Sequence, residues 1–319
     1  MKILVTGGAG FIGSNVVENY VKSGHEVIVV DNLSSGKIEN IPSGVSFYPV
    51  DVRADELEEI IAVHQPDIVN HHAAQKSVLA SIKDPLLDTD INLIGMIKLL
   101  NASVKHGVKK FIFASSGGAL SGDASQIPTP ESWVPSFSSP YAINKYVCER
   151  YLALFSDLYG LDFTVLRYAN VYGPRQDTAG ESGVVSIFIQ NILNHVPSSI
   201  FTDLTMPRGT ARDYVYVDDV AQANTLALSR GNLEILNIGS GREVYTADLY
   251  FKLEGIMETH IPPTYSERPV GDVARSCLDS TRVRDVLGWE PVVDLMQGLV
   301  RTVTYYKDIH FRSRARERN

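Results

Sequence analysis

A tyrosine and a lysine four residues apart are the residues of this chain best suited to proton transfer. Tyr141 and Lys145 follow Pro140, which fits the first turn of a helix, and their spacing places both side chains on one helical face. An ammonium group near a phenol, together with a nearby cationic ring, would favour the phenolate and bring the tyrosine pKa down from about 10 toward neutrality. The alternative is a surface aromatic residue packed beside the aliphatic stem of a lysine.

Two serines upstream strengthen the chemical interpretation. Ser115 and Ser116 end an apolar run that predicts a strand, and either hydroxyl could hydrogen-bond the oxygen that exchanges the proton. We expect Ser116 to act there, with Ser115 as the alternative. The candidate catalytic residues are therefore Tyr141, Lys145, Ser116 and Ser115.

The first residues of the chain predict a dinucleotide site. Gly8-x-Gly10-x-x-Gly13 lies between a predicted strand, Lys2–Thr6, and a predicted helix, Phe11–Lys22. Glycines there permit a tight turn and close approach of the backbone to a pyrophosphate, and the helix N-terminus offers free N–H groups. Asp31 ends the next predicted strand, where a carboxylate accepts both ribose hydroxyls and repels a 2′-phosphate. This arrangement favours NAD over NADP.

Polar and small residues also follow the third and fourth predicted strands. Asp51 could hydrogen-bond an adenine amino group, or could equally be a turn or capping residue. Ala73 and Ala74 are small enough for a flat cofactor to pass over the backbone. His71 and His72 are adjacent in a strand and point to opposite faces, so we predict no metal site.

Strand and helix patterns alternate through the first half of the chain, which predicts an α/β fold with a doubly wound, parallel (Rossmann) sheet. We expect a NAD-binding domain over residues 1–171, with 215–240 rejoining its sheet, and a smaller mixed α/β substrate domain over 172–319. The predicted strands are Lys2–Thr6, Glu26–Asp31, Val45–Asp51, Asp67–His71, Lys110–Ser115, Asp162–Tyr168 and Glu234–Ile238. The predicted helices are Phe11–Lys22, Glu56–His64, Asp84–His106, Ala142–Tyr159 and Asp218–Arg230.

Two segments carry further expectations. Asp84–His106 is apolar on more than one face, so it is either buried or meets another subunit. The basic end Phe311–Asn319 is expected to be a frayed terminus.

The composition excludes several classes of protein. The chain has 319 residues and a net charge of −8, which argues against a nucleic-acid binder. The sequence contains no apolar run long enough to span a membrane and no visible signal peptide. Its two cysteines, Cys148 and Cys277, are too few for a disulfide framework, so we expect a reduced, cytoplasmic protein.

Two arginines in the second half are suited to phosphates. Arg212 and Arg268 could each hold a diphosphate bidentately. The alternative is that each pairs with a nearby acid, Asp213 for the first and Glu267 or Asp272 for the second.

Taken together, these motifs resemble the extended short-chain dehydrogenases/reductases. The resemblance rests on Thr6–Gly13, Asp31–Gly36, His72–Gln75, Ser115-Ser116 and Tyr141-x-x-x-Lys145. Leu166–Arg175, Arg212–Asp219 and Arg268-x-x-Gly-Asp272 are similar to the nucleotide-sugar branch, and most of all to the UDP-glucose 4-epimerases.

The resemblance implies NAD as a permanently bound cofactor, a UDP-sugar substrate, interconversion of UDP-glucose and UDP-galactose through a 4-keto sugar, and a homodimer. Tyr141 would be the base, and Lys145 would bind the ribose and lower the tyrosine pKa. The matching cofactor positions are Gly7, Gly10, Phe11, Ile12, Gly13, Asp31, Asn32, Gly36, Asp51, Val52, Ala73, Ala74, Gln75, Lys76, Asn92, Ser115, Tyr141, Lys145, Tyr168 and Val171. The matching substrate positions are Asn170, Phe201, Arg212, Arg268, Asp272 and Ser276.

The sequence also departs from the family pattern. Ser121 replaces an aromatic residue, and the stretch 199–208 lacks the usual Gly-Asp-Gly turn. Gly117–Leu120 supplies neither the acids of a 4,6-dehydratase nor the glutamate of a uronate decarboxylase, which favours simple epimerisation. A small residue, Ser276, suggests room for a 2-acetamido group. A UDP-glucuronate 4-epimerase, another oxidoreductase or dehydratase of the family, and a non-catalytic NAD-binding regulator remain alternatives.

Overall fold

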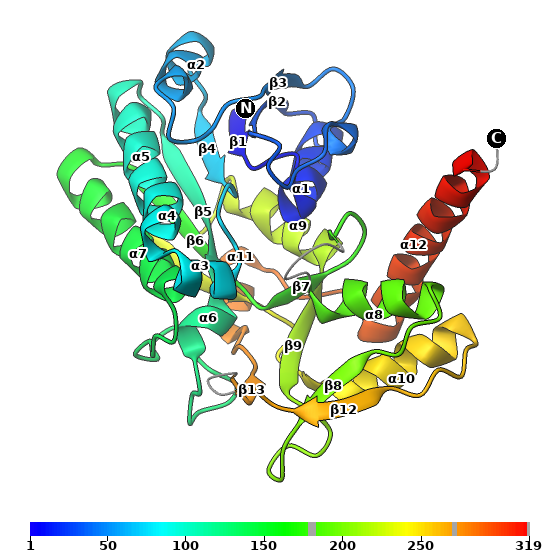
Figure 1. Cartoon of the computed structure of the whole chain (residues 1–319). Helices are drawn as coiled ribbons and strands as arrows, with labels where there is room; N and C mark the ends of the chain where they lie inside the picture. The colour runs from blue at the N-terminus through cyan, green and yellow to red at the C-terminus, as the bar shows by residue number, and fades with distance from the viewer. Residues whose placement is uncertain (178–182, 270–272, 318–319) are drawn as a thin grey trace.

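The computed structural model describes residues 1–177, 183–269 and 273–312, and the backbone of 313–317. Its N-terminal half, together with β6 and β10 from later in the chain, forms a seven-stranded sheet in the order β10-β6-β5-β4-β1-β2-β3, and every neighbouring pair is parallel (Figure 1). The strands are β1 (Lys2–Thr6), β2 (Glu26–Val30), β3 (Ser46–Tyr48), β4 (Ile68–His71), β5 (Lys110–Ser116), β6 (Asp162–Tyr168) and β10 (Glu234–Ile238). The predicted doubly wound sheet is confirmed.

Helices cover both faces of this sheet because successive strand residues point to opposite sides. Ile3 and Val5 of β1 share a core with α1 (Phe11–Lys22), α9 (Val217–Ala227) and α11 (Thr281–Leu287). On the other face, Leu4 shares a core with α2 (Glu56–His64), α5 (Gly95–Lys105) and α7 (Pro140–Tyr159). Residues as late in the chain as α11 therefore pack on the N-terminal sheet.

The strand order determines where a ligand site is expected. From β1 the chain winds outward to β2 and β3, then returns to β4 on the other side of β1. The crevice beyond the carboxyl ends of β1 and β4 is the switch point at which ligands of doubly wound sheets bind.

Smaller sheets and a second core form the C-terminal half, on the lower right of Figure 1. The central strand β9 (Ala211–Tyr216) pairs with β7 (Asn170–Tyr172), β11 (Glu243–Tyr245) and β13 (Arg275–Ser276). A separate pair is formed by β8 (Ser199–Thr202) and β12 (Thr264–Glu267). The helices of this core are α8 (Val184–Leu193), α10 (Thr246–Met257) and α12 (Leu295–Glu317).

The segment expected as one helix, Asp84–His106, is divided. It forms α4 (Pro85–Thr89), a π-turn η2 (Asp90–Ile94) and α5, and it follows the short helix α3 (Val78–Lys83). The Asp84 carboxylate caps α4 by accepting from the Leu87 N–H at 3.0 Å. The π-turn adds backbone between α4 and α5, and it rotates their apolar positions relative to one another.

Several other bounds also differ from the sequence prediction. Asp31 and Asp51 lie beyond their strands, which end at Val30 and Tyr48, and Ser116 is still within β5. The C-terminal tail was expected to fray, but α12 continues to Glu317. Among the residues that the structure describes, no helix is long and apolar enough to cross a membrane.

Candidate active site

The glycine-rich turn lies against the end of β4. Gly7 has φ +69°, and a Cβ on it would stand 2.5 Å from the Ala73 nitrogen; a Cβ on Gly13 would stand 2.1 Å from the Gly7 oxygen. Only glycine fits such contacts, because each distance is well inside van der Waals contact. Helix α1 begins at Phe11, and its N-cap residue Gly10 has no side chain to cap it, so the first N–H groups of the helix are available to phosphate oxygens.

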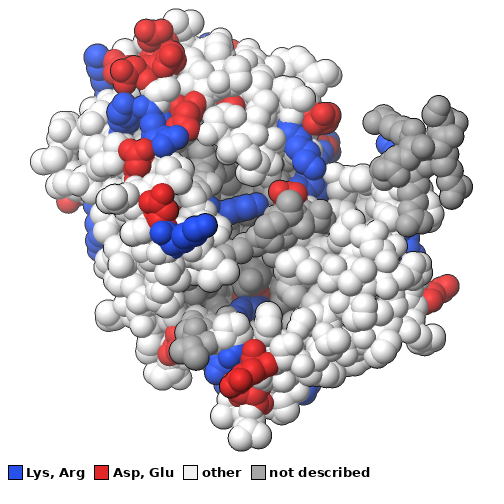
Figure 2. All heavy atoms as spheres, viewed as in Figure 1, with Lys and Arg blue, Asp and Glu red and all other residues white. Residues whose placement is uncertain are grey.

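A cleft of about 560 Å³ opens from this turn toward α7. Figure 2 shows the surface hollowed between the two halves of the molecule. The predicted residues that line the cleft are Gly7, Gly10, Phe11, Ile12, Gly13, Asp31, Asn32, Asp51, Val52, Ala73, Ala74, Gln75, Lys76, Ser115, Tyr141, Lys145 and Tyr168. The cleft is also lined by residues that were not predicted to bind the cofactor: Ser34, Ser35, Val50, His72, Ser77, Ile91, Ala114 and Asp177.

Three predicted cofactor residues are not part of the cleft lining. A Cβ on Gly36 would stand 2.8 Å from Ala9 Cβ, so Gly36 allows its loop to pack on the glycine-rich turn. Val171 lies in β7 and packs against the N-terminal core. The side chain of Asn92 is buried in contact with the Gln75 backbone. These residues support the cleft from behind.

Asp31 is placed to organise the adenosine end. One carboxylate oxygen accepts from the Ala9 N–H at 3.0 Å and the other from the Leu33 N–H at 2.8 Å. Each oxygen retains a further lone pair that can accept a hydroxyl. The residue therefore fastens the glycine-rich turn to the β2 loop and still faces the cleft.

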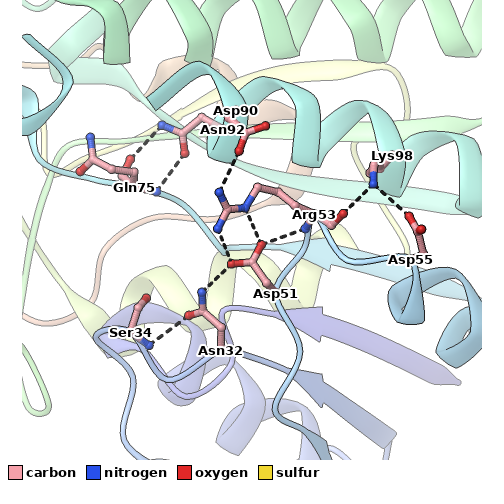
Figure 3. Close-up of polar contacts among 9 residues, drawn as sticks. All are labelled: Asn32, Ser34, Asp51, Arg53, Asp55, Gln75, Asp90, Asn92 and Lys98. Carbon is pink, nitrogen blue, oxygen red and sulfur yellow. Dashed lines mark hydrogen bonds and ion pairs between the residues drawn. The ribbon is translucent and has the colours of Figure 1, made fainter. Parts of the chain in front are cut away.

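Asp51 belongs to a charged network rather than acting as a lone acid (Figure 3). Arg53 grips both of its carboxylate oxygens, with Nε at 2.8 Å and Nη2 at 2.9 Å, while Nη1 reaches Asp90 at 2.8 Å. Asn32 donates to the same carboxylate at 2.8 Å. The Arg53 guanidinium is the largest cause that holds the pKa of Asp51 well below its usual range, so this acid remains ionised.

Gln75 and Asn92 bind one another through backbone and side chain (Figure 3). The Gln75 N–H donates to Asn92 Oδ1 at 2.9 Å, and Asn92 Nδ2 donates to the Gln75 carbonyl at 2.9 Å. The Gln75 side chain donates to Asp88 at 2.7 Å and to the Ser77 carbonyl at 2.8 Å. These bonds fix the segment that follows β4 along the cleft floor.

The proton-transfer residues come together at the opposite end of the cleft. Tyr141 and Lys145 lie on α7 with the lysine Nζ 5.8 Å from the tyrosine ring centroid. Lys145 donates to the Ala114 carbonyl at 2.8 Å. Burial raises the pKa of Tyr141, and an interaction of its phenol with the Ser116 hydroxyl lowers it in part. Ser116, rather than Ser115, is therefore the serine in contact with the tyrosine.

Ser115 has a different partner. Its hydroxyl donates to the Glu149 carboxylate at 2.6 Å, and Arg167 binds both oxygens of that carboxylate at 2.9 and 2.6 Å. Glu149 is 0% exposed, so its charge is balanced entirely by buried partners. This buried ion pair joins β5, β6 and α7 behind the cleft.

The protein alone does not bring the tyrosine toward neutrality. Burial raises the pKa of Tyr141 to about 12 and lowers the pKa of Lys145 to about 8. Desolvation is the largest cause of both shifts, and the lysine Nζ is bonded to the Ala114 carbonyl. The expected phenolate therefore needs a second positive charge, such as a cationic nicotinamide.

The two histidines have separate partners. His71 Nδ1 shares a 2.6 Å hydrogen bond with Thr6 Oγ1, and His72 Nε2 shares one of 3.2 Å with the Tyr168 hydroxyl. Burial lowers the pKa of His72 to about 3 and lowers that of His71 as well, so both rings are neutral. In the described part of the chain, no cluster of three or more His, Cys, Asp or Glu could hold a metal ion.

Three of the predicted substrate residues come from the second sheet. Asn170 begins β7, Arg212 lies in β9, and Ser276 pairs with Arg212 in the parallel ladder of β13 and β9. Ser276 is buried, and its hydroxyl would be 3.4 Å from a Cβ placed on Gly118. The small residue is thus beside α6 (Gly117–Ser121), the short helix that follows Ser116.

Phe201 and Arg268 belong to the β8–β12 pair. Phe201 is 44% exposed, and Arg268 Nε donates to Asp203 at 2.6 Å. Among the described residues Arg268 pairs with Asp203, an acid that the two alternatives from the sequence, Glu267 and Asp272, did not include. Asp272 lies outside the described residues.

The alternative for Arg212 also needs correction. Asp213 accepts from Ser240, Gly241 and Leu278, while Arg212 donates to the Ala211 and Ala274 carbonyls. Adjacent strand residues point to opposite faces, which separates the two side chains.

Sequence reasoning missed the buried polar residues that support the site. Asp88, Asn144, Glu149 and Arg167 are all buried and hydrogen-bonded behind it. The signal available was spacing, since Asp88 lies four residues before Asn92 and Glu149 lies four after Lys145.

A doubly wound parallel sheet with a Tyr–Lys pair at its cofactor cleft defines the class of extended short-chain dehydrogenases/reductases. The model of the NAD dependent epimerase/dehydratase family matches residues 3–239, and this chain belongs to that family.

Named relatives cover nearly the whole chain. A putative UDP-glucose 4-epimerase of Methanocaldococcus jannaschii is 41% identical over 96% of this chain and 98% of its own. The crystal structure of a UDP-glucose 4-epimerase from Thermotoga maritima with UDP-glucose is 49% identical, with a TM-score of 0.94 over 97% of this chain and 100% of its own. That of a UDP-glucose 4-epimerase from Thermus thermophilus in complex with NAD is 42% identical, with a TM-score of 0.89 over 96% and 99%.

Proposed function

We propose that this protein is an NAD-dependent UDP-sugar 4-epimerase that interconverts UDP-glucose and UDP-galactose. The observation that carries the proposal is the contact of Tyr141 with Ser116 at the end of a dinucleotide cleft, on the side where Ser276 lies beside Gly118. The relatives named above, one with NAD and one with UDP-glucose, support the same substrate and cofactor.

The residues of the cleft fit NAD. Gly7, Gly10 and Gly13 leave space for a pyrophosphate at the start of α1, Asp31 accepts ribose hydroxyls, and Lys145 faces the nicotinamide end. When bound, NAD supplies a ring that takes a hydride from carbon 4 of the sugar and returns it.

Tyr141 handles the proton that accompanies this exchange. As phenolate it accepts the proton of the C4 hydroxyl, and as phenol it returns that proton to the C4 oxygen. Ser116 contacts the phenol and orients it, and the charge of Lys145 favours the phenolate.

Inversion requires the sugar to present its other face while the nucleotide stays bound. Arg212 and Arg268 hold the diphosphate, and Asn170, Phe201 and Asp272 complete the nucleotide contacts. The proposed mechanism requires loose binding of the sugar, so that its ring can turn about the diphosphate link between removal and return of hydrogen.

Ser276 favours a second substrate pair. The short side chain of Ser276 stands where the family resemblance implies either a bulky or a small residue, so we also propose turnover of UDP-GlcNAc and UDP-GalNAc.

The proposed functional unit is a cytoplasmic homodimer. Both thiols, Cys148 and Cys277, are free and buried, which fits a reducing compartment. Apolar side chains on α4 and α7 are exposed, with Leu86 at 82% and Leu158 at 61%. We propose that a second copy covers them, and Leu158→Glu should then yield monomers by light scattering.

The direct test is incubation of the purified protein with UDP-glucose, UDP-GlcNAc or UDP-glucuronate separately, with products resolved by NMR. We expect epimerised product without added coenzyme and without net absorbance change at the NADH band. Accumulating NADH would indicate a dehydrogenase, product only from UDP-glucuronate would indicate a uronate epimerase, and no product with NAD bound would indicate a regulator.

A further inference from the structure

The carboxylate of Asp88 accepts hydrogen bonds from three side-chain amides. Asp88 lies on α4 and is 1% exposed. Its Oδ1 accepts from Gln75 Nε2 at 2.7 Å and from Asn92 Nδ2 at 2.9 Å, and its Oδ2 accepts from Asn144 Nδ2 at 2.7 Å. A carboxylate satisfies these donors because it accepts only.

Two of these amides, those of Gln75 and Asn92, belong to the part of the structure that forms the cofactor side of the cleft. Asn92 lies in the π-turn η2, and it bonds both the N–H and the carbonyl of Gln75. Gln75 follows Ala73 and Ala74, and all three line the cleft. The position of this cleft wall therefore depends on the orientation of the Asn92 amide, which Asp88 sets.

The third amide, that of Asn144, lies on the helix that carries the candidate catalytic residues. Asn144 immediately precedes Lys145 on α7 and is itself buried. It donates to Thr89 at 3.2 Å as well as to Asp88. This contact ties the α7 turn that carries Tyr141 and Lys145 to α4.

We propose that Asp88 is a positioning residue that holds the cofactor-binding segment 73–76 and the catalytic turn of α7 in register. Its carboxylate touches neither cofactor nor substrate and acts through Asn92, Gln75 and Asn144. The proposal rests on the proposed function, because it assigns to this network the retention of NAD in an epimerase that never releases it during turnover.

The test compares Asp88→Asn with Asp84→Asn in the holoenzyme. Asp88→Asn keeps the size of the side chain but brings an NH₂ group toward other donors, so at least one amide loses its acceptor. Asp84→Asn changes an exposed cap of the same helix, and asparagine caps as well as aspartate. It is therefore a matched charge control that leaves the network intact.

The readout is the rate of NAD release, followed by transfer of released cofactor to a dehydrogenase trap below the unfolding temperature of every variant. We expect Asp88→Asn to release NAD about tenfold faster or more. Its KM for UDP-glucose should stay unchanged, whereas Asp84→Asn should match the wild type in both. Equal release rates for Asp88→Asn and Asp84→Asn would overturn the proposal.

A second variant covers the case in which Asp88→Asn does not fold. Gln75→Met removes one amide from a partly exposed position and should speed NAD release in the same direction. Where Asp88→Asn does fold, the effects of the two changes in the double variant should be less than additive, because both act through one network. Unchanged release by Gln75→Met would also contradict the proposal. Failure of the proposed function would differ, since the wild type would then make no epimerised sugar whatever its NAD release rate.

Discussion

The Ser115 hydroxyl donates a 2.6 Å hydrogen bond to the buried carboxylate of Glu149, so the two neighbouring serines of β5 have different tasks. Ser116, on the other face of the strand, contacts Tyr141. Because Arg167 still holds Glu149 when Ser115 is removed, the buried charge keeps a partner.

We therefore expect Ser116→Ala to lower kcat about 10²-fold through loss of a donor near the reacting oxygen. Ser115→Ala should retain most activity and lose about 1 kcal/mol of unfolding free energy. Steady-state kinetics and denaturant titrations of both variants provide the check. A larger kcat loss in Ser115→Ala would reverse the assignment.

Tyr141→Phe tests the proton carrier. The change removes only the hydroxyl, so kcat should fall about 10³-fold or more. NAD content after purification should remain at the wild-type level, because the phenol contributes to chemistry more than to cofactor affinity. Near-normal turnover in this variant would exclude Tyr141 from proton transfer.

Lys145→Met tests the source of the phenolate. Burial raises the pKa of Tyr141, and a positive charge near it opposes that effect. The active form is the phenolate, so activity is lost as pH falls through the tyrosine pKa. Removing the ammonium group should raise that pKa and move the acid limb of the kcat profile up by about one to two pH units. A limb that stays in place would show that Lys145 only binds cofactor.

Asp31→Ala should weaken cofactor retention. The variant loses acceptors for the ribose hydroxyls and for the Ala9 and Leu33 N–H groups. We expect about tenfold weaker NAD binding or more, measured by calorimetry on protein stripped of cofactor. Unchanged affinity would remove Asp31 from the adenosine site.

Ser276→Tyr tests sugar size. A bulky side chain beside Gly118 would fill the space proposed for a 2-acetamido group. Turnover of UDP-GlcNAc should be abolished while UDP-glucose turnover persists, as resolved by NMR of each reaction. Equal losses on both substrates would instead indicate a general disturbance of β13, with Ser276→Thr as the conservative control.

The sequence predicted the fold and the candidate reactive groups because both depend on patterns within short segments of the chain. Gly7–Gly13 encodes a turn that only glycine can form, and the Tyr141–Lys145 spacing encodes one helix face. Alternating strand and helix patterns then required the parallel sheet, in which strand ends meet at one edge.

The tertiary structure decided which neighbours each reactive group has. The bond of Ser115 to Glu149, the pairing of Arg268 with Asp203, and the break of Asp84–His106 into two helices around a π-turn all depend on contacts between distant segments. Burial likewise raises the pKa of Tyr141, an effect that the four-residue spacing alone does not reveal. The spacing of two residues determines whether they share a helix face. Only packing determines how far that face is exposed to solvent and which groups it contacts.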